Sequence, residues 1–407
     1  MFKNLIPYSL EISAKILGLI TTVYVLSSLS IVDFGEYSFL RGFALITSTI
    51  LIFGLQASSF KFANKTYPFS SEYLMFSLMI MAVNIIAFWL FNSFFGAFIF
   101  GKFEHDIGFY AYFLVFSNML LLFFTAFMKG RGSPIIGFAI NFVVVFLFLL
   151  ALISINNETG HLQPILKALV AVHLFVAILV LTFMLSQLSK AHIDYNKLFK
   201  LRVEWTEVSF AMWLGGFLPA LLLQGLTIVF GIYFSGVPLG EIGIALIIVI
   251  NMGVFKEVSI ALFLPKLIYG CNHLKVFDKK RLSFCIAIGT LPIGGGIILL
   301  YSLEHLLLSV FPEKLSNTVF TFVYLLAFGQ IFMAIYQPIF RLLSAVGMHK
   351  SVLNTSVSLM LVLVFMFYLS AHIYHNYFYT VASAVTVCIL AVICSLILLK
   401  KKVASMI

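Results

Sequence analysis

Residues 135–153 read IIGFAINFVVVFLFLLALI, a run of 19 residues without a single charge. As an α-helix this run would be about 28 Å long, close to the thickness of the hydrocarbon core of a bilayer. Similar runs recur from end to end of the 407-residue chain, in which 62% of the residues are apolar and 10% are charged. A soluble protein of this length needs more charge to cover its surface. The composition therefore predicts an all-α protein that crosses a membrane many times.

The apolar runs predict about twelve transmembrane helices in two groups of six. They are expected at residues 9–30, 37–58, 73–100, 108–128, 135–153 and 164–186, then at 207–232, 240–264, 283–303, 317–338, 351–371 and 378–399. The expected organisation is an N-terminal six-helix bundle (1–186), a basic cytoplasmic linker (187–206), a C-terminal six-helix bundle (207–399) and a basic cytoplasmic tail (400–407).

The Lys and Arg residues predict the orientation. If the N-terminus is cytoplasmic, nineteen of the 25 fall in inner loops, and only Lys102 and Lys314 fall in outer loops. Cytoplasmic loops carry this excess of basic residues, so the net charge of +10 reflects topology and not nucleic-acid binding. Glu11 and Lys15 interrupt the first apolar run, which argues against a cleavable signal peptide. We expect a multi-pass protein of the bacterial inner membrane with both termini in the cytoplasm.

The two halves of the chain resemble each other. Residues 25–35 (VLSSLSIVDFG) and 233–243 (YFSGVPLGEIG) each join two apolar runs, and each has an acid two positions before a final glycine. Residues 114–118 (LVFSN) and 326–330 (LAFGQ) each precede a base by eleven positions. Because each half has an even number of spans, the repeats would run parallel, related by an axis along the membrane normal. This arrangement predicts a cavity between two bundles, which suits alternating access.

Charged side chains inside spans are the sharpest functional signals, because each is costly to place in hydrocarbon. Arg41 either snorkels to the outer headgroups or contacts an anion in a cavity, and we favour the cavity. Lys15 and Glu11 lie one helical turn apart. They either neutralise each other and snorkel, or they face the cavity on one stripe with Gly18 and Thr22.

Further candidates lie in the sixth, seventh and eighth spans. Lys256 is a second candidate for an anion contact, and Glu257 is more simply the partner of a base than a proton carrier. His173 either bonds across helices or titrates as a coupling group. Gln224 lies on a face of small residues that either packs tightly or is wet, and Lys167 is expected to snorkel. The aromatic candidates for stacking on sugars are Tyr24, Tyr112, Trp213 and Tyr336.

The sequence contains no common catalytic pattern. We find no Walker A, HExxH or GxSxG motif and no paired intramembrane carboxylates. The four cysteines form no CxxC pair and predict neither a disulfide framework nor a metal site. We therefore expect a protein that is not an enzyme and holds no cofactor, with H⁺ or Na⁺ left open as a coupling ion.

Two stretches carry a resemblance to a known family. Residues 23–37 (VYVLSSLSIVDFGEY) resemble the end of the first helix in Wzx-type O-antigen flippases of the multidrug/oligosaccharidyl-lipid/polysaccharide (MOP) exporter superfamily. Asp33, Phe34, Gly35 and Tyr37 match that phrase, whereas Ser30 stands where glycine is usual. Residues 126–134 (AFMKGRGSP) are similar to the family's basic turn between spans four and five.

The resemblance implies a V-shaped pair of six-helix bundles around a cationic cavity lined by spans one, two, seven and eight. The implied substrate is an undecaprenyl-diphosphate-linked oligosaccharide, moved from the cytoplasmic to the periplasmic leaflet for O-antigen of lipopolysaccharide or a related surface polysaccharide. Other polysaccharide-assembly membrane proteins and the lipid bilayer are the implied partners, with no nucleic acid. Arg41, Lys15 and Lys256 lie on the implied cavity spans, although no family motif fixes them.

Three other functions remain as alternatives. A cation-coupled multidrug antiporter of the MATE type would call for acidic residues in the cavity, but Glu11 and Glu257 each have a lysine within about a turn. A membrane glycan polymerase or acyltransferase would call for a large outer loop, which the sequence lacks. A purely structural scaffold would leave the intramembrane charges unexplained.

Overall fold

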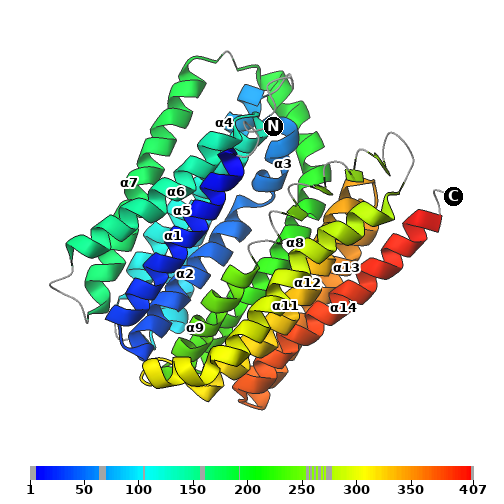
Figure 1. Ribbon diagram of the computed structural model, residues 1–407. Helices are drawn as coiled ribbons and strands as arrows, with labels where there is room; N and C mark the ends of the chain where they lie inside the picture. The colour runs from blue at the N-terminus through cyan, green and yellow to red at the C-terminus, as the bar shows by residue number, and fades with distance from the viewer. Residues whose placement is uncertain are drawn as a thin grey trace. The chain divides into compact units, whose positions relative to one another are not determined.

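The computed structural model describes residues 6–63, 70–103, 106–155, 161–191, 193–253, 256, 259–260, 263–264, 267–268, 270–271 and 277–404. Figure 1 shows the helices of these residues, coloured along the chain. They are α1 (Ile6–Ser28), α2 (Ile31–Ile52), α3 (Leu55–Phe62), α4 (Ser70–Phe100), α5 (Ile107–Gly130), α6 (Pro134–Ser154), α7 (Leu162–Ser189), α8 (Tyr195–Tyr233), α9 (Val237–Met252), α11 (Lys279–Val310), α12 (Asn317–Ala345), α13 (His349–Phe367), the π-helical η4 (Tyr368–Ile373) and α14 (Tyr377–Ala404).

The described residues form an all-α membrane protein, as predicted. They contain no strand, and nine of their helices are long and apolar enough to cross a bilayer. Each of the twelve expected spans overlaps a helix. Large apolar side chains stay exposed along these helices, including Phe94 (80%), Leu291 (72%) and Ile298 (70%). Such surfaces are stable only in contact with lipid.

The chain divides into two compact units, Met1–Trp213 (unit 1) and Leu214–Ile407 (unit 2). The boundary falls inside α8, a helix of 39 residues that already begins within the segment 187–206, expected to be a linker. The predicted limits of the two six-helix bundles were drawn from membrane spans and not from contacts. They therefore stay a prediction.

The second span is broken, whereas residues 37–58 were expected to form one continuous helix. Phe53 and Gly54 both adopt the left-handed conformation, with φ of 46° and 79°, so α2 ends and α3 starts anew. The break frees carbonyl groups of the last turn of α2, which is costly inside a membrane unless other donors reach them.

Two side chains from distant helices supply those donors. The Asn84 amide of α4 donates to the Leu51 carbonyl. The Trp213 indole N–H of α8 donates to the Thr49 carbonyl at 3.0 Å, and its ring packs on Phe53 with the centroids 5.0 Å apart. The broken helix is therefore a supported element of unit 1.

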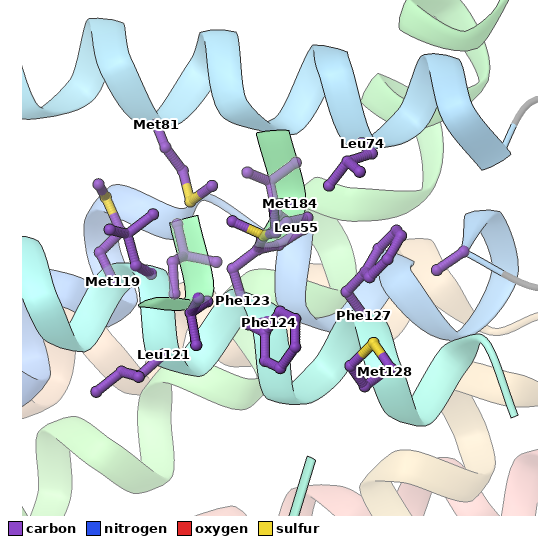
Figure 2. Packing of buried hydrophobic residues seen from close by; sticks show 14 of the residues in the cluster. Leu55, Leu74, Met81, Met119, Leu121, Phe123, Phe124, Phe127, Met128 and Met184 are labelled. Atoms are coloured by element: carbon purple, nitrogen blue, oxygen red, sulfur yellow. The ribbon is translucent and has the colours of Figure 1, made fainter. Parts of the chain in front are cut away.

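In unit 1, α5 is the central helix. It contacts α2, α3, α4, α6 and α7, and a cluster of Phe, Met and Leu side chains fills the space between α3, α4, α5 and α7. Figure 2 shows Leu74 and Met81 of α4 and Met184 of α7 directed into this cluster. Gly130 at the end of α5 lies so close to α3 that a Cβ there would clash with the Ser59 carbonyl.

In unit 2, α12 takes the place that α5 has in unit 1. It contacts α9, α11, α13 and α14, which correspond in chain order to α2, α4, α6 and α7. The two matched stretches, residues 114–118 and 326–330, lie on α5 and α12 respectively. The sequence repeat therefore coincides with a repeat of helix contacts, each unit taken by itself.

Candidate functional site

Arg41 is an exposed cation in the middle of α2. It lies ten residues after the helix start at Ile31, which is about 15 Å along the axis. We had placed it only one turn inside the span, because the helix was expected to start at residue 37. The greater depth weakens the snorkelling alternative.

The fully buried Tyr37 holds the Arg41 guanidinium in place. Arg41 Nη1 donates to Tyr37 Oη at 3.2 Å, and the Arg41 Cζ lies 5.5 Å from the Tyr37 ring centroid. In the described part of unit 1, no carboxylate pairs with Arg41. Since a guanidinium has five N–H donors, most of them stay available to an anion.

His173 of α7 lies near Arg41, close enough for the charge of Arg41 to act on the imidazole. Its Nδ1 is 2.8 Å from the Leu169 carbonyl, one turn earlier on the same helix. This local bond leaves Nε2 for other partners, and the side chain is half-buried. Nδ1 of His173 therefore bonds within its own helix and not across helices.

On α1, Lys15 is exposed and Glu11 is half-buried. The two do not form the expected ion pair in the part of α1 that is described. Thr22 is buried, and its hydroxyl donates to the Gly18 carbonyl at 2.7 Å. A Cβ on Gly18 would lie 4.0 Å from Val145 of α6. Gly18 and Thr22, which are two of the four residues of the predicted polar stripe, therefore pack within unit 1.

Lys256 is buried inside unit 2, with 6% of its surface exposed. Its Nζ donates to Gln330 Oε1 of α12 at 3.3 Å, and Gln330 is itself only 2% exposed. The backbone of Lys256 packs on α11, where a Cβ on Gly289 would lie 3.6 Å from Lys256 Cα. An anion could reach the ammonium only after a movement that uncovers it.

Gln224, Tyr336 and Trp213 all have contacts that are structural. Gln224 on α8 is half-buried, and its carbonyl accepts from the Thr227 hydroxyl at 2.6 Å. Glu257 lies outside the described residues. Tyr336, expected to stack on sugars, is fully buried in α12, and Trp213 instead supports the break between α2 and α3.

Three buried carboxylates were missed from the sequence. Glu36 and Glu241 lie near the starts of α2 and α9 and are 6% and 8% exposed, and Glu72 in the first turn of α4 is 4% exposed. Glu241 Oε1 accepts from the Ser316 hydroxyl at 2.6 Å. Glu72 lies in the first turn of its helix, where the helix dipole stabilises negative charge, whereas Glu36 and Glu241 lie beyond the first turns of α2 and α9. In the sequence, only the position of these residues near predicted helix starts could have indicated that their carboxylates are buried.

The comparisons with known proteins identify the fold. No protein-family model and no curated protein matches the chain. Solved structures that match almost all of it include a lipid II flippase and two MATE transporters. The lipid II flippase MurJ, inward closed, has a TM-score of 0.69 at 13% identity and covers 98% of this chain and 90% of its own.

The other two are MATE transporters. The multidrug transporter DinF-BH has a TM-score of 0.69 at 15% identity, covering 97% of this chain and 95% of its own. The transporter ClbM in complex with Rb⁺ has a TM-score of 0.55 at 13% identity, covering 95% and 91%. A further match is described as a MATE family transporter of the MOP superfamily. This chain is a multi-pass membrane protein with the fold of the lipid II flippase MurJ and of the MATE transporters.

Proposed function

We propose that this protein is a lipid-linked oligosaccharide flippase of the Wzx type. It would move undecaprenyl-diphosphate-linked glycan units from the cytoplasmic to the periplasmic leaflet of the inner membrane, by alternating access, for O-antigen or a related surface polysaccharide. The MOP fold is compatible with this function, because it also occurs in a lipid II flippase.

The observation that carries the proposal is Arg41. It is an exposed guanidinium in the middle of α2, a helix of 22 residues, and it is anchored by Tyr37. A diphosphate cannot enter hydrocarbon without compensating charge, and a guanidinium binds phosphate oxygens through paired donors. The exposed Lys15 would add positive charge on α1, and the buried Lys256 would act after rearrangement. The polyprenyl tail can remain in lipid while the headgroup crosses.

A cation-coupled multidrug antiporter is the second candidate. The fold matches MATE transporters equally well, and the buried Glu36 and Glu241 are acids of the kind that cation binding needs. Glu241, however, accepts a bond from Ser316 and lies close to a helix start, which explains its burial structurally. The positive charge of Arg41 would also repel a cationic drug.

Transport in proteoliposomes tests the proposal. The purified protein is reconstituted with a fluorescent undecaprenyl-diphosphate oligosaccharide, and a membrane-impermeant quencher reports the fraction in the outer leaflet. We expect the protein to make nearly all of the lipid accessible within the assay. Arg41→Met should slow the reaction by about tenfold or more, as expected for loss of charge-assisted bonds. Lys167→Met is the matched control, because Lys167 is also exposed on a spanning helix, and should transport normally.

The competing functions give different results in the same vesicles. Efflux of a cationic dye driven by an H⁺ or Na⁺ gradient, without lipid scrambling, would show an antiporter. Equal transport by wild type and Arg41→Met would remove Arg41 from the site. In cells, loss of the gene should leave lipid-linked glycan units on the cytoplasmic face, whereas their accumulation on the periplasmic face would indicate a polymerase.

A further inference from the structure

A small pocket opens at the end of unit 1 where α4 starts and α5 and α7 end. It is lined by Ser70, Ser71 and Leu74 of α4, Phe127 of α5, Arg131 in the following turn, and Gln187 and Leu188 of α7. The distribution of basic residues places this end in the cytoplasm. The pocket is remote in sequence from Arg41, and nothing in the proposed transport function uses it.

Arg131 gives the pocket its charge. Its Nη1 points to Gln187 Oε1 at 3.5 Å, and its Cζ lies 5.9 Å from the Phe127 ring centroid. Its position after the last turn of α5 favours a cation, but the side chain extends across to α7. Within the described ranges, no carboxylate pairs with Arg131. The remaining guanidinium donors are therefore free to bind a ligand.

Two charged groups near the pocket, Lys129 and Glu72, have contacts outside it. The Lys129 ammonium lies 3.9 Å from the Phe138 ring centroid of α6. Glu72 does not line the pocket, and its Oε1 accepts from the Asp194 backbone N–H at 3.3 Å. The pocket thus combines one cation with the Ser70 and Ser71 hydroxyls in the first turn of α4.

Apolar side chains form the rest of the wall. Leu74 and Phe127 belong to the apolar cluster of unit 1, where Figure 2 shows them side by side at one end, and Leu188 closes the α7 side. The lining therefore changes from polar to apolar within one small space. The headgroup region of a phospholipid presents the same change, from phosphate to glycerol and acyl chain.

We propose that this pocket binds a phosphate group, that of an anionic phospholipid in the inner leaflet. Arg131 binds the phosphate oxygens through two N–H groups, as guanidinium does with oxyanions. Ser70 and Ser71 donate hydroxyl bonds, and the acyl side of the lipid contacts the half-buried Leu188. Free phosphate offers the same oxygens without the apolar part, so the two sources can be separated.

Thermal melting of the purified full-length protein in detergent tests the site. Phosphatidylglycerol should raise Tm more than phosphatidylcholine does at equal concentration, because the choline cation of phosphatidylcholine offsets the charge of its phosphate. Arg131→Gln should weaken the apparent affinity for phosphatidylglycerol by about tenfold. Lys190→Gln is the matched control, because Lys190 is exposed three residues beyond Gln187 and does not line the pocket. It should keep the full shift.

Two further arms complete the test. In the first, inorganic phosphate is titrated alone. A rise in Tm with phosphate but none with phosphatidylglycerol would overturn the lipid assignment. The Ser70→Ala/Ser71→Ala variant keeps Arg131, and phosphatidylglycerol should raise its Tm by less than that of the wild type. This variant tests the pocket even if Arg131→Gln folds poorly. Equal shifts in wild type and both variants, or an equal effect of Lys190→Gln, would overturn the pocket itself.

Discussion

At the residue scale, the most unusual feature of unit 2 is the buried ammonium of Lys256. A buried charge is costly, and the Gln330 carbonyl oxygen offsets part of that cost at 3.3 Å. Lys256 could be recognised from the sequence, because a charge inside an apolar run stands out. Gln330 could not be recognised as its partner, since the two residues are 74 positions apart and meet only through the packing of α12.

The pairing predicts non-additive stability. Gln330→Leu should destabilise the protein by about 1.5–3 kcal/mol, because it removes an acceptor from a charged donor. Lys256→Met should cost less than Gln330→Leu, because it removes the buried charge and leaves only the neutral Gln330 oxygen without this donor. The double variant should then be more stable than Gln330→Leu alone, as measured by unfolding in mixed detergent micelles.

A matched control lies on the same helix. Gln337 is buried on α12, and its Oε1 has no hydrogen-bond partner among the described residues. Gln337→Leu should cost little, and its effect should add to that of Lys256→Met. If the effects of Gln330→Leu and Lys256→Met on stability also added, the pairing of Lys256 with Gln330 would be contradicted.

At the element scale, the existence of the helices could be predicted, but the break between α2 and α3 could not. Glycine inside an apolar run does not by itself end a helix, and Gly54 was one of 26 glycines. The break depends on Asn84 and Trp213, which reach the freed carbonyls from α4 and α8. The depth of Arg41 was misjudged for a related reason, because Asp33 and Glu36 hid the true start of α2.

Gly130 is predicted to be intolerant of a side chain. A Cβ there would lie 2.8 Å from the Ser59 carbonyl carbon and 3.2 Å from Ala63 Cβ, so α3 and α5 would be forced apart. Gly130→Ala should destabilise unit 1 by about 1–3 kcal/mol, seen as a lower Tm. Gly294→Ala in α11 is the control, because nothing lies within 4 Å of its Cβ position. It should be neutral or stabilising, and equal effects of both variants would argue against the close crossing.

At the scale of the whole molecule, the sequence repeat and the loop charges predict the topology. The repeat of helix contacts around α5 and α12 agrees with two equivalent halves. The residues of a transport site were harder to predict, because the burial of Lys256 and Tyr336 follows from packing inside unit 2 and not from the pattern of the sequence.

Cysteine labelling checks the orientation. The native thiols, three buried and one half-buried, are replaced by alanine, and single cysteines are placed at Lys102, Lys190, Lys314 and Lys401. A membrane-impermeant maleimide should label positions 102 and 314 in intact spheroplasts, and positions 190 and 401 only after permeabilisation. The reverse pattern would invert the predicted topology.

The break after α2 also has a consequence for biogenesis. α3 has only eight residues, too few to enter a bilayer independently. Its place is secured by Tyr73, whose hydroxyl donates to the Leu55 carbonyl at 2.6 Å and lies 3.0 Å from the Ser58 hydroxyl. Tyr73 and α5 are translated later than α3. We therefore expect α3 to wait beside the translocon until its neighbours emerge, and to settle by assembly with them and not by its own partitioning into lipid.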